Sequence, residues 1–146
     1  MIPFIDLQAQ RIRLDGKIEA AVAEAVVGGA WVMGPQVRQF EANLAAFGNA
    51  KHALGCANGT DALALPLMAW GIKAGDAVFV PSFTFAATAE VVPWFGAEPV
   101  FVDVDPITYN MDPAKLAAAI DAVKAEGRLT PRVVIAVDPF GQPADY

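Results

Sequence analysis

The sequence predicts an α/β fold built on a parallel sheet. Beyond residue 48, short apolar runs alternate with helical stretches, and this order is typical of strands joined by right-handed crossovers. The runs are almost continuously apolar, as in strands that are covered on both faces. Hydrophobic residues make up 55% of the 146 residues, which excludes intrinsic disorder and is enough for a core.

Composition excludes several classes of function. Ten Lys and Arg against sixteen Asp and Glu give a net charge of −6, which argues against a general nucleic-acid binder. Asp6 and Arg11 come too early for a signal peptide, and the charge-free stretch 62–72 is too short to cross a bilayer. We therefore expect a cytoplasmic protein with neither a nucleic-acid nor a membrane partner.

The chain has one cysteine, Cys56, and one histidine, His52. This count excludes a disulfide within the chain and a Cys/His cluster for zinc, so we predict no metal site. The two residues lie four apart on an expected strand, and we expect them not to meet as a nucleophilic pair.

Two helices are predicted in an N-terminal domain of residues 1–48. The first begins after Asp6, a suitable N-cap, and runs to Val27, where Gly28-Gly29 ends it. A loop over 30–34 carries Trp31. The second helix begins at Pro35 and ends before Gly48.

The remaining residues, 49–146, are expected to form the first part of an α/β domain. We expect four strands with helices between them: strands at 53–57, 77–80, 99–104 and 133–137, and helices at 61–70, 86–95 and 113–125. The chain reaches Tyr146 where a further helix should begin, so we expect an incomplete fold.

The turn after the first expected strand could bind an anion. Gly59 lets the backbone approach a ligand closely, and Thr60 is expected to cap the following helix. The N–H groups of Asp61 and Ala62 would then point at the anion with the helix dipole behind them. A plain capping turn without a ligand explains the same residues. The chain has neither a P-loop nor a G-x-G-x-x-G motif.

Aromatic residues occur at expected loop positions. Phe83 and Phe85 follow a strand, where they would stack on a flat heterocycle or simply plug the end of the core. Trp31 is likewise a capping aromatic or a substrate contact. Asp105 and Asp138 each precede a proline. We interpret both first as turn residues and only distantly as metal ligands.

Several motifs occur in order along the chain and together resemble the N-terminal part of the DegT/DnrJ/EryC1/StrS family of sugar aminotransferases. The segment 56–63 is similar to that of transaminases acting on UDP-linked 3-keto sugars such as 2-acetamido-3-oxo-glucuronic acid. The motifs are Phe4-Ile5-Asp6-Leu7, Gly34-Pro35-Gln36-Val37, Asn58-Gly59-Thr60-Asp61-Ala62-Leu63, Gly75-Asp76, Pro81-Ser82-Phe83-Thr84-Phe85, Gly96-Ala97-Glu98-Pro99-Val100-Phe101-Val102-Asp103, Tyr109-Asn110-Met111-Asp112-Pro113 and Phe140-Gly141-Gln142.

The resemblance implies a homodimeric fold-type-I enzyme that uses pyridoxal phosphate (PLP). Its large domain would be a three-layer α/β/α sandwich, incomplete in this chain. Such enzymes move an amino group, usually from glutamate, to a keto group of a nucleotide-linked sugar. The residues that match the family's cofactor-binding positions are Gly59, Thr60 and Asp61 for the phosphate and Phe85 for the ring. Gly29 and Trp31 match its nucleotide-sugar loop, where relatives often carry Tyr.

Two departures accompany the resemblance. Pro66 falls inside an expected helix, where proline costs about 3 kcal/mol or forces a kink. The Schiff-base lysine and the aspartate of the pyridine nitrogen are expected downstream, because none of the five lysines matches. We thus predict no catalytic residue here and no activity for the 146-residue chain alone.

Three alternatives stay open. One is a PLP-dependent sugar dehydratase of the same family, in which histidine replaces the lysine. Another is a naturally short, non-catalytic chain that binds a phosphate ligand or cofactor or complements another subunit. The third is a plain α/β binding domain whose likeness to the family is fortuitous.

Overall fold

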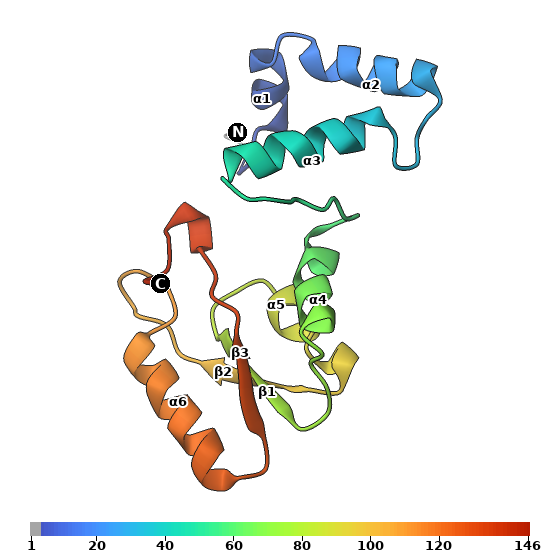
Figure 1. Cartoon of the computed structure of the whole chain (residues 1–146). Coiled ribbons are helices and arrows are strands. Elements are labelled where there is room, and N and C mark those ends of the chain that lie inside the picture. Colours follow the sequence, from blue (N-terminus) through green and yellow to red (C-terminus); the bar gives the residue numbers. More distant parts are fainter. Residues whose placement is uncertain (1–3) are drawn as a thin grey trace. The chain divides into compact units, whose positions relative to one another are not determined.

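The computed structural model describes residues 4–146, so the first three residues of the expected N-terminal domain lie outside it. Contacts divide the chain into two units, one ending at Gly55 and the other beginning at Cys56. Figure 1 shows a helical unit in blue to turquoise and an α/β unit in green to red.

The helical unit contains three helices: α1 (Leu7–Arg13), α2 (Lys17–Gly28) and α3 (Pro35–Phe47). The single helix predicted from Asp6 to Val27 is wrong, because the backbone turns left-handed at Asp15 (φ 47°) and Gly16 (φ 73°). Asp and Gly adopt this conformation at low cost, and it ends a right-handed helix. The predicted cap is confirmed, since the Asp6 Oδ1 accepts a hydrogen bond from the amide of Ala9 at 2.9 Å.

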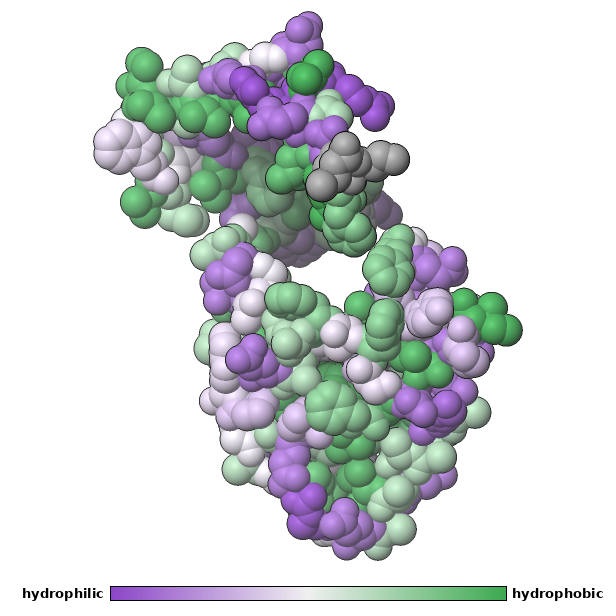
Figure 2. All heavy atoms as spheres, turned by 180° about the vertical axis from the view of Figure 1, so that it is seen from behind, coloured by the Kyte–Doolittle hydropathy of each residue, from purple (hydrophilic) through white to green (hydrophobic). Residues whose placement is uncertain are grey.

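The other helix ends of this unit follow the sequence signals. Gly29 caps α2 in a left-handed conformation (φ 67°), Pro35 is the first residue of α3, and Gly48 follows its end. None of the three helices buries a residue, although each carries apolar side chains. Figure 2 shows such side chains in green at the surface, beside hydrophilic ones in purple.

The α/β unit is built on a three-stranded sheet in the order β2-β1-β3, and both pairings are parallel. The predicted α/β class with a parallel sheet is therefore confirmed. Its elements are α4 (Gly59–Ala69), β1 (Asp76–Pro81), α5 (Ala87–Glu90), the 3-10 turn η1 (Pro93–Phe95), β2 (Glu98–Val102), α6 (Pro113–Glu126), β3 (Thr130–Val134) and the 3-10 turn η2 (Pro139–Gly141).

The central strand β1 is buried on both faces and separates two apolar clusters. Val78 and Val80 pack with Leu67 of α4 and with Val91 and Val92 beside α5. The alternate residues of β1 point the other way. Ala77 and Phe79 pack with Val102 of β2 and with Val123 of α6. Helices thus cover both faces of the sheet, in three layers (Figure 1).

Three expected elements differ from the structure. Residues 53–57 form no strand, and the amide of Gly55 donates to the carboxylate of Glu41 in α3 at 2.7 Å instead of to a neighbouring strand. The helix predicted over 86–95 is shortened to α5, because Pro93 has no N–H with which to continue the helical hydrogen bonds. The strands predicted at 99–104 and 133–137 begin earlier and end sooner.

The interior proline predicted from the sequence is confirmed in α4. Pro66 lies well inside the helix, and the helix continues beyond it, because the amide of Trp70 donates to the Pro66 carbonyl at 2.9 Å. The carbonyl of Ala62, one turn earlier, has no helical donor at this position. No helix in the described part of the chain is long and apolar enough to cross a membrane.

We predict that Pro66→Ala stabilises the complete protein, by up to about 3 kcal/mol in the free energy of unfolding, because it restores a helical hydrogen bond. Pro113→Ala is the matched control. Pro113 is the first residue of α6, where its missing N–H costs nothing, so this variant should change stability little. Denaturant unfolding measures both, and equal effects would contradict the prediction.

Candidate functional site

A cavity of about 590 Å³ opens at the carboxyl ends of β1 and β3, beside the start of α4. Ligands of open α/β sheets bind at this edge, because the loops after neighbouring parallel strands meet there. Most of the wall is apolar. The lining residues are Gly59, Thr60, Leu63, Phe83, Thr84, Phe85, Ala87, Thr88, Val137, Pro139 and Phe140.

Asn58, not Thr60, caps α4. The Asn58 Oδ1 accepts from the amide of Asp61 at 2.9 Å, and the Asn58 carbonyl accepts from the amide of Ala62 at 3.1 Å. The expectation that these two N–H groups are free is therefore wrong. Among residues 4–146, the amides of Gly59 and Thr60 have no hydrogen-bond partner instead, and both residues line the cavity.

Asp61 differs from the other predicted phosphate residues. Its carboxylate accepts from the Asn58 Nδ2 at 3.2 Å, and its side chain lines a separate hollow with Cys56 and Met68. Gly59, by contrast, has nothing within 4 Å of the position where a Cβ would stand. The helix start is thus open on the side of Gly59 and Thr60.

Aromatic side chains form the far walls of the cavity. Phe85 is 80% exposed, so it does not plug the core. Phe83 lies between two other rings, with centroid distances of 5.4 Å to Tyr109 and 6.3 Å to Phe140. The lining role of Val137, Pro139 and Phe140 was not predicted from the sequence, although these residues follow a strand just as residues 82–85 do.

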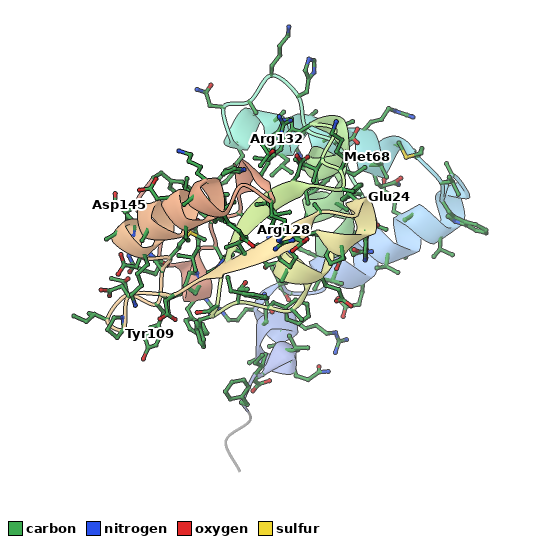
Figure 3. All side chains as sticks on the ribbon, turned by 90° about the horizontal axis from the view of Figure 1, so that it is seen from below. Glu24, Met68, Tyr109, Arg128, Arg132 and Asp145 are labelled. Atoms are coloured by element: carbon green, nitrogen blue, oxygen red, sulfur yellow. The ribbon has the colours of Figure 1, made fainter. Side chains whose placement is uncertain are left out.

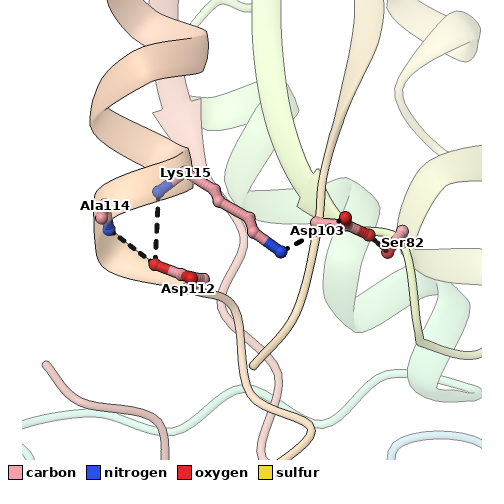
Figure 4. Close-up of polar contacts among 5 residues, drawn as sticks. All are labelled: Ser82, Asp103, Asp112, Ala114 and Lys115. Atoms are coloured by element: carbon pink, nitrogen blue, oxygen red, sulfur yellow. Dashed lines mark hydrogen bonds and ion pairs between the residues drawn. The ribbon is translucent and has the colours of Figure 1, made fainter. Parts of the chain in front are cut away.

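A polar group joins the ends of β1 and β2 (Figure 4). The hydroxyl of Ser82 donates to the Asp103 Oδ1 at 3.2 Å, and the Nζ of Lys115 lies 3.3 Å from the Asp103 Oδ2. Asp112 caps α6 by accepting from the amide of Ala114 at 2.8 Å. These groups are exposed, so the ion pair adds little stability. No cluster of His, Cys, Asp or Glu within residues 4–146 could hold a metal ion.

The two aspartates that precede prolines make the predicted turns. The Asp105 Oδ1 accepts from the amides of Ile107 and Thr108 at 2.9 and 2.8 Å, and these hydrogen bonds lower the pKa of Asp105. The Asp138 Oδ1 accepts from the amide of Ala144 at 2.8 Å. It also accepts from the hydroxyl of Tyr146 at 3.0 Å, which raises the pKa of that phenol.

Gly29 and Trp31 belong to the helical unit, in the segment between α2 and α3. Gly29 is the left-handed cap of α2. The indole of Trp31 is 73% exposed, and its Nε1 donates to the carbonyl of Val26 at 3.4 Å. The indole face is thus free to stack on a ligand, and the expected contact with a nucleotide sugar stays a prediction.

The Asp105 turn should weaken in acid. Because the folded-state pKa is lowered, the carboxylate stabilises the protein above the ordinary aspartate pKa of about 3.9, and this contribution is lost as pH falls through the folded value. Asp105→Asn keeps an oxygen acceptor without the charge. We expect it to be less stable than the wild type at neutral pH, with the difference closing below about pH 4. Unfolding free energies across this range test the prediction, and a constant difference would contradict it.

Comparisons with known proteins show the family of the chain. The model of the DegT/DnrJ/EryC1/StrS aminotransferase family matches residues 13–146. The chain is 47% identical to the UDP-2-acetamido-2-deoxy-3-oxo-D-glucuronate aminotransferase of Pseudomonas aeruginosa, over all of this chain and 39% of that protein. It is 43% identical to the UDP-N-acetyl-3-dehydro-alpha-D-glucosamine 3-aminotransferase of Acidithiobacillus ferrooxidans, over 99% of this chain and 37% of that one.

Solved structures agree with this assignment. A DegT DnrJ EryC1 StrS aminotransferase from Brucella abortus superposes with a TM-score of 0.96 at 55% identity, covering 100% of this chain and 39% of that one. The NtdA structure from Bacillus subtilis, with bound cofactor PMP, gives a TM-score of 0.79 at 28% identity, over 99% and 32%. The chain thus spans about two fifths of its relatives' length. It belongs to the DegT/DnrJ/EryC1/StrS aminotransferase family, whose aminotransferases depend on PLP.

Proposed function

We propose that the complete protein is a PLP-dependent aminotransferase that moves an amino group to a keto group of a nucleotide-linked sugar. One observation carries this proposal most directly. Two amides at the start of α4 that have no partner among residues 4–146 line the same cavity as an exposed aromatic ring, at the carboxyl end of the sheet. A phosphate attached to a flat ring needs this combination of groups.

The start of α4 suits the phosphate of PLP. The amides of Gly59 and Thr60 supply two donors, the dipole of an 11-residue helix favours negative charge there, and the hydroxyl of Thr60 adds a third donor. The open space beside Gly59 lets an oxygen approach the backbone, where a Cβ would stand in the way. The residues present therefore fit the group.

The apolar walls suit the pyridine ring. Phe85 offers an exposed face for stacking, and Leu63, Val137 and Phe140 line the cavity around it. The volume lies within the range of small-molecule sites. When bound, PLP supplies an electron sink for the bond cleavages of transamination. The side chains named here would hold the ring and exclude water from it.

No lysine is among the residues that line the cavity. Transamination on PLP needs a lysine that binds the cofactor and moves a proton between carbon atoms. We infer that this lysine belongs to another part of the complete polypeptide, together with the acid that pairs with the pyridine nitrogen. On this view the 146-residue chain alone is inactive.

The substrates are proposed from the relatives. The names of the two relatives described above give UDP-linked 3-keto sugars as substrates, and we propose that class as the amino acceptor and glutamate as the donor. Gly29 and Trp31 would contact the nucleotide sugar, with the indole stacking on a flat or apolar surface. A homodimer in the cytoplasm is part of the same proposal.

Cofactor retention tests the site. In the complete protein, Thr60→Val removes a hydroxyl donor to a charged phosphate and should weaken PLP binding by about tenfold or more. Phe85→Ala removes the stacking face and should weaken binding severalfold and shift the cofactor's absorbance. Dialysis followed by visible spectroscopy measures both effects.

Two controls match these changes outside the cavity. Thr130→Val alters an exposed threonine at the start of β3, and Phe101→Ala an exposed phenylalanine of β2. Both should keep wild-type occupancy. Losses as large as those of the cavity variants would contradict the assignment.

The reaction itself is tested with a UDP-linked 3-keto sugar and glutamate. We expect an amino sugar and 2-oxoglutarate in equal amounts, with both products absent when PLP is removed. A deoxy keto sugar formed together with 2-oxoglutarate and free ammonia, with no amino sugar, would identify the dehydratase alternative instead.

A further inference from the structure

The loop between β2 and α6 reaches a segment that is distant in sequence. The Asn110 Nδ2 donates to the carbonyl of Pro143 at 2.6 Å, across 33 residues. The Asn110 side chain is inside the unit, since the residue is only 7% exposed. Because the Asn110 donor is buried, its bond to the Pro143 carbonyl is partly shielded from water and fixes the distance between the two segments.

The segment that receives this bond, residues 136–146, forms part of the cavity wall through Val137, Pro139 and Phe140. Its other hydrogen bonds are internal, such as those that the Asp138 Oδ1 accepts from the amide of Ala144 and the hydroxyl of Tyr146. Among residues 4–146, the bond from Asn110 is the one hydrogen bond that ties this segment to the rest of the unit.

The neighbouring residue contacts the same wall. Tyr109 lies at the edge of the α/β unit (Figure 3), and its ring stacks obliquely on Phe83, which in turn faces Phe140. Its backbone is left-handed (φ 62°), which is costly for an aromatic residue, and its amide donates to the carbonyl of Asp105 at 2.8 Å. The loop thus holds an unfavourable conformation that places a ring against the cavity aromatics.

Stability alone does not account for Asn110. Its Oδ1 is buried without any hydrogen-bond partner in the described chain. A buried unpaired acceptor is destabilising, and an apolar side chain of similar size would avoid that cost. The side-chain amide of Asn110 is therefore best explained by its Nδ2 donor, which holds the carbonyl of Pro143.

We propose that Asn110 is a positioning residue for the cofactor cavity: its amide anchors residues 136–146 and so keeps Phe140 and Pro139 in the wall opposite the start of α4. The cofactor part rests on the function proposed above. The anchoring part concerns this chain alone, so the two are tested by different measurements.

Hydrogen exchange of the complete protein without cofactor tests the anchor. Asn110→Leu removes the donor at nearly constant size, and we expect exchange of the amides in 141–146 to accelerate about tenfold while β1 stays protected. Thr108→Val is the control, because it removes contacts to Asp105 and to the amide of Asn110 in the same loop but not the bond to Pro143. Unchanged exchange in 141–146, or an equal rise in β1, would overturn the anchor.

Asn110→Asp gives a second, reversible test. Its ionised carboxylate has no donor and repels the Pro143 carbonyl, whereas the protonated acid donates an O–H to it. Burial raises the pKa of such a carboxyl, so protection of 141–146 relative to wild type should recover between about pH 8 and about pH 5. Protection that is independent of pH would contradict the proposed donor role.

PLP affinity and absorbance then test the positioning role. We expect Asn110→Leu to weaken PLP binding severalfold and shift its absorbance, with Thr108→Val like the wild type. Faster exchange in 141–146 with unchanged PLP binding and spectrum would overturn the positioning role. A wild-type protein that binds no PLP would overturn the proposed function, and the exchange data would still decide the anchor.

Discussion

The burial of β1 on both faces is the constraint on which the α/β unit depends. All six residues of this strand are buried, and both β2 and β3 take their parallel register from it. Parallel pairing places the carboxyl ends of the strands at one edge of the sheet, so the segments 82–85 and 137–140 meet there, where Phe83 packs near Phe140. The cavity is a consequence of that arrangement, and its polarity is decided by the helix that starts beside it.

The position of the α4 N-cap decides which backbone donors the cavity receives. With Asn58 as the cap, its side chain and carbonyl accept hydrogen bonds from the amides of Asp61 and Ala62. The amides of Gly59 and Thr60 are left without a partner among residues 4–146. A cap at Thr60 would shift the free donors along the helix by two residues, about 200° around its axis. The carboxamide of Asn58 thus selects the face of α4 that can bind an anion, although Asn58 itself is not among the lining residues.

Local signals predicted the parts of the fold that are decided locally. Asp6, Asp112, Gly29 and Gly127 mark helix ends through the shape and hydrogen bonding of single residues, and the apolar run at 77–80 marks the buried strand. The run at 53–57 looked the same but is no strand, because an apolar run does not encode whether a neighbouring strand is there to pair with it. The Asp15-Gly16 break was hidden by apolar periodicity that continues on both sides.

Gly59, Thr60 and Phe85 were found by their places after expected strands, whereas the bond from Asn110 to Pro143 spans 33 residues and leaves no local pattern.

The charge distribution explains why an anion at the start of α4 would depend on backbone dipoles. The chain carries a net charge of −6, and none of the described residues that line the cavity is charged. Several cations of the α/β unit are already paired: Arg128 with Glu98 and Glu126, Lys115 with Asp103, and Arg132 with Asp76. The pairing of Arg128 also lowers the pKa of Glu98 and so keeps that carboxylate charged. An anion at the start of α4 would therefore be held by the oriented N–H groups and the helix dipole. The helix fixes the direction of such donors, so they select among anions by geometry. A flexible lysine would select an anion by its charge alone.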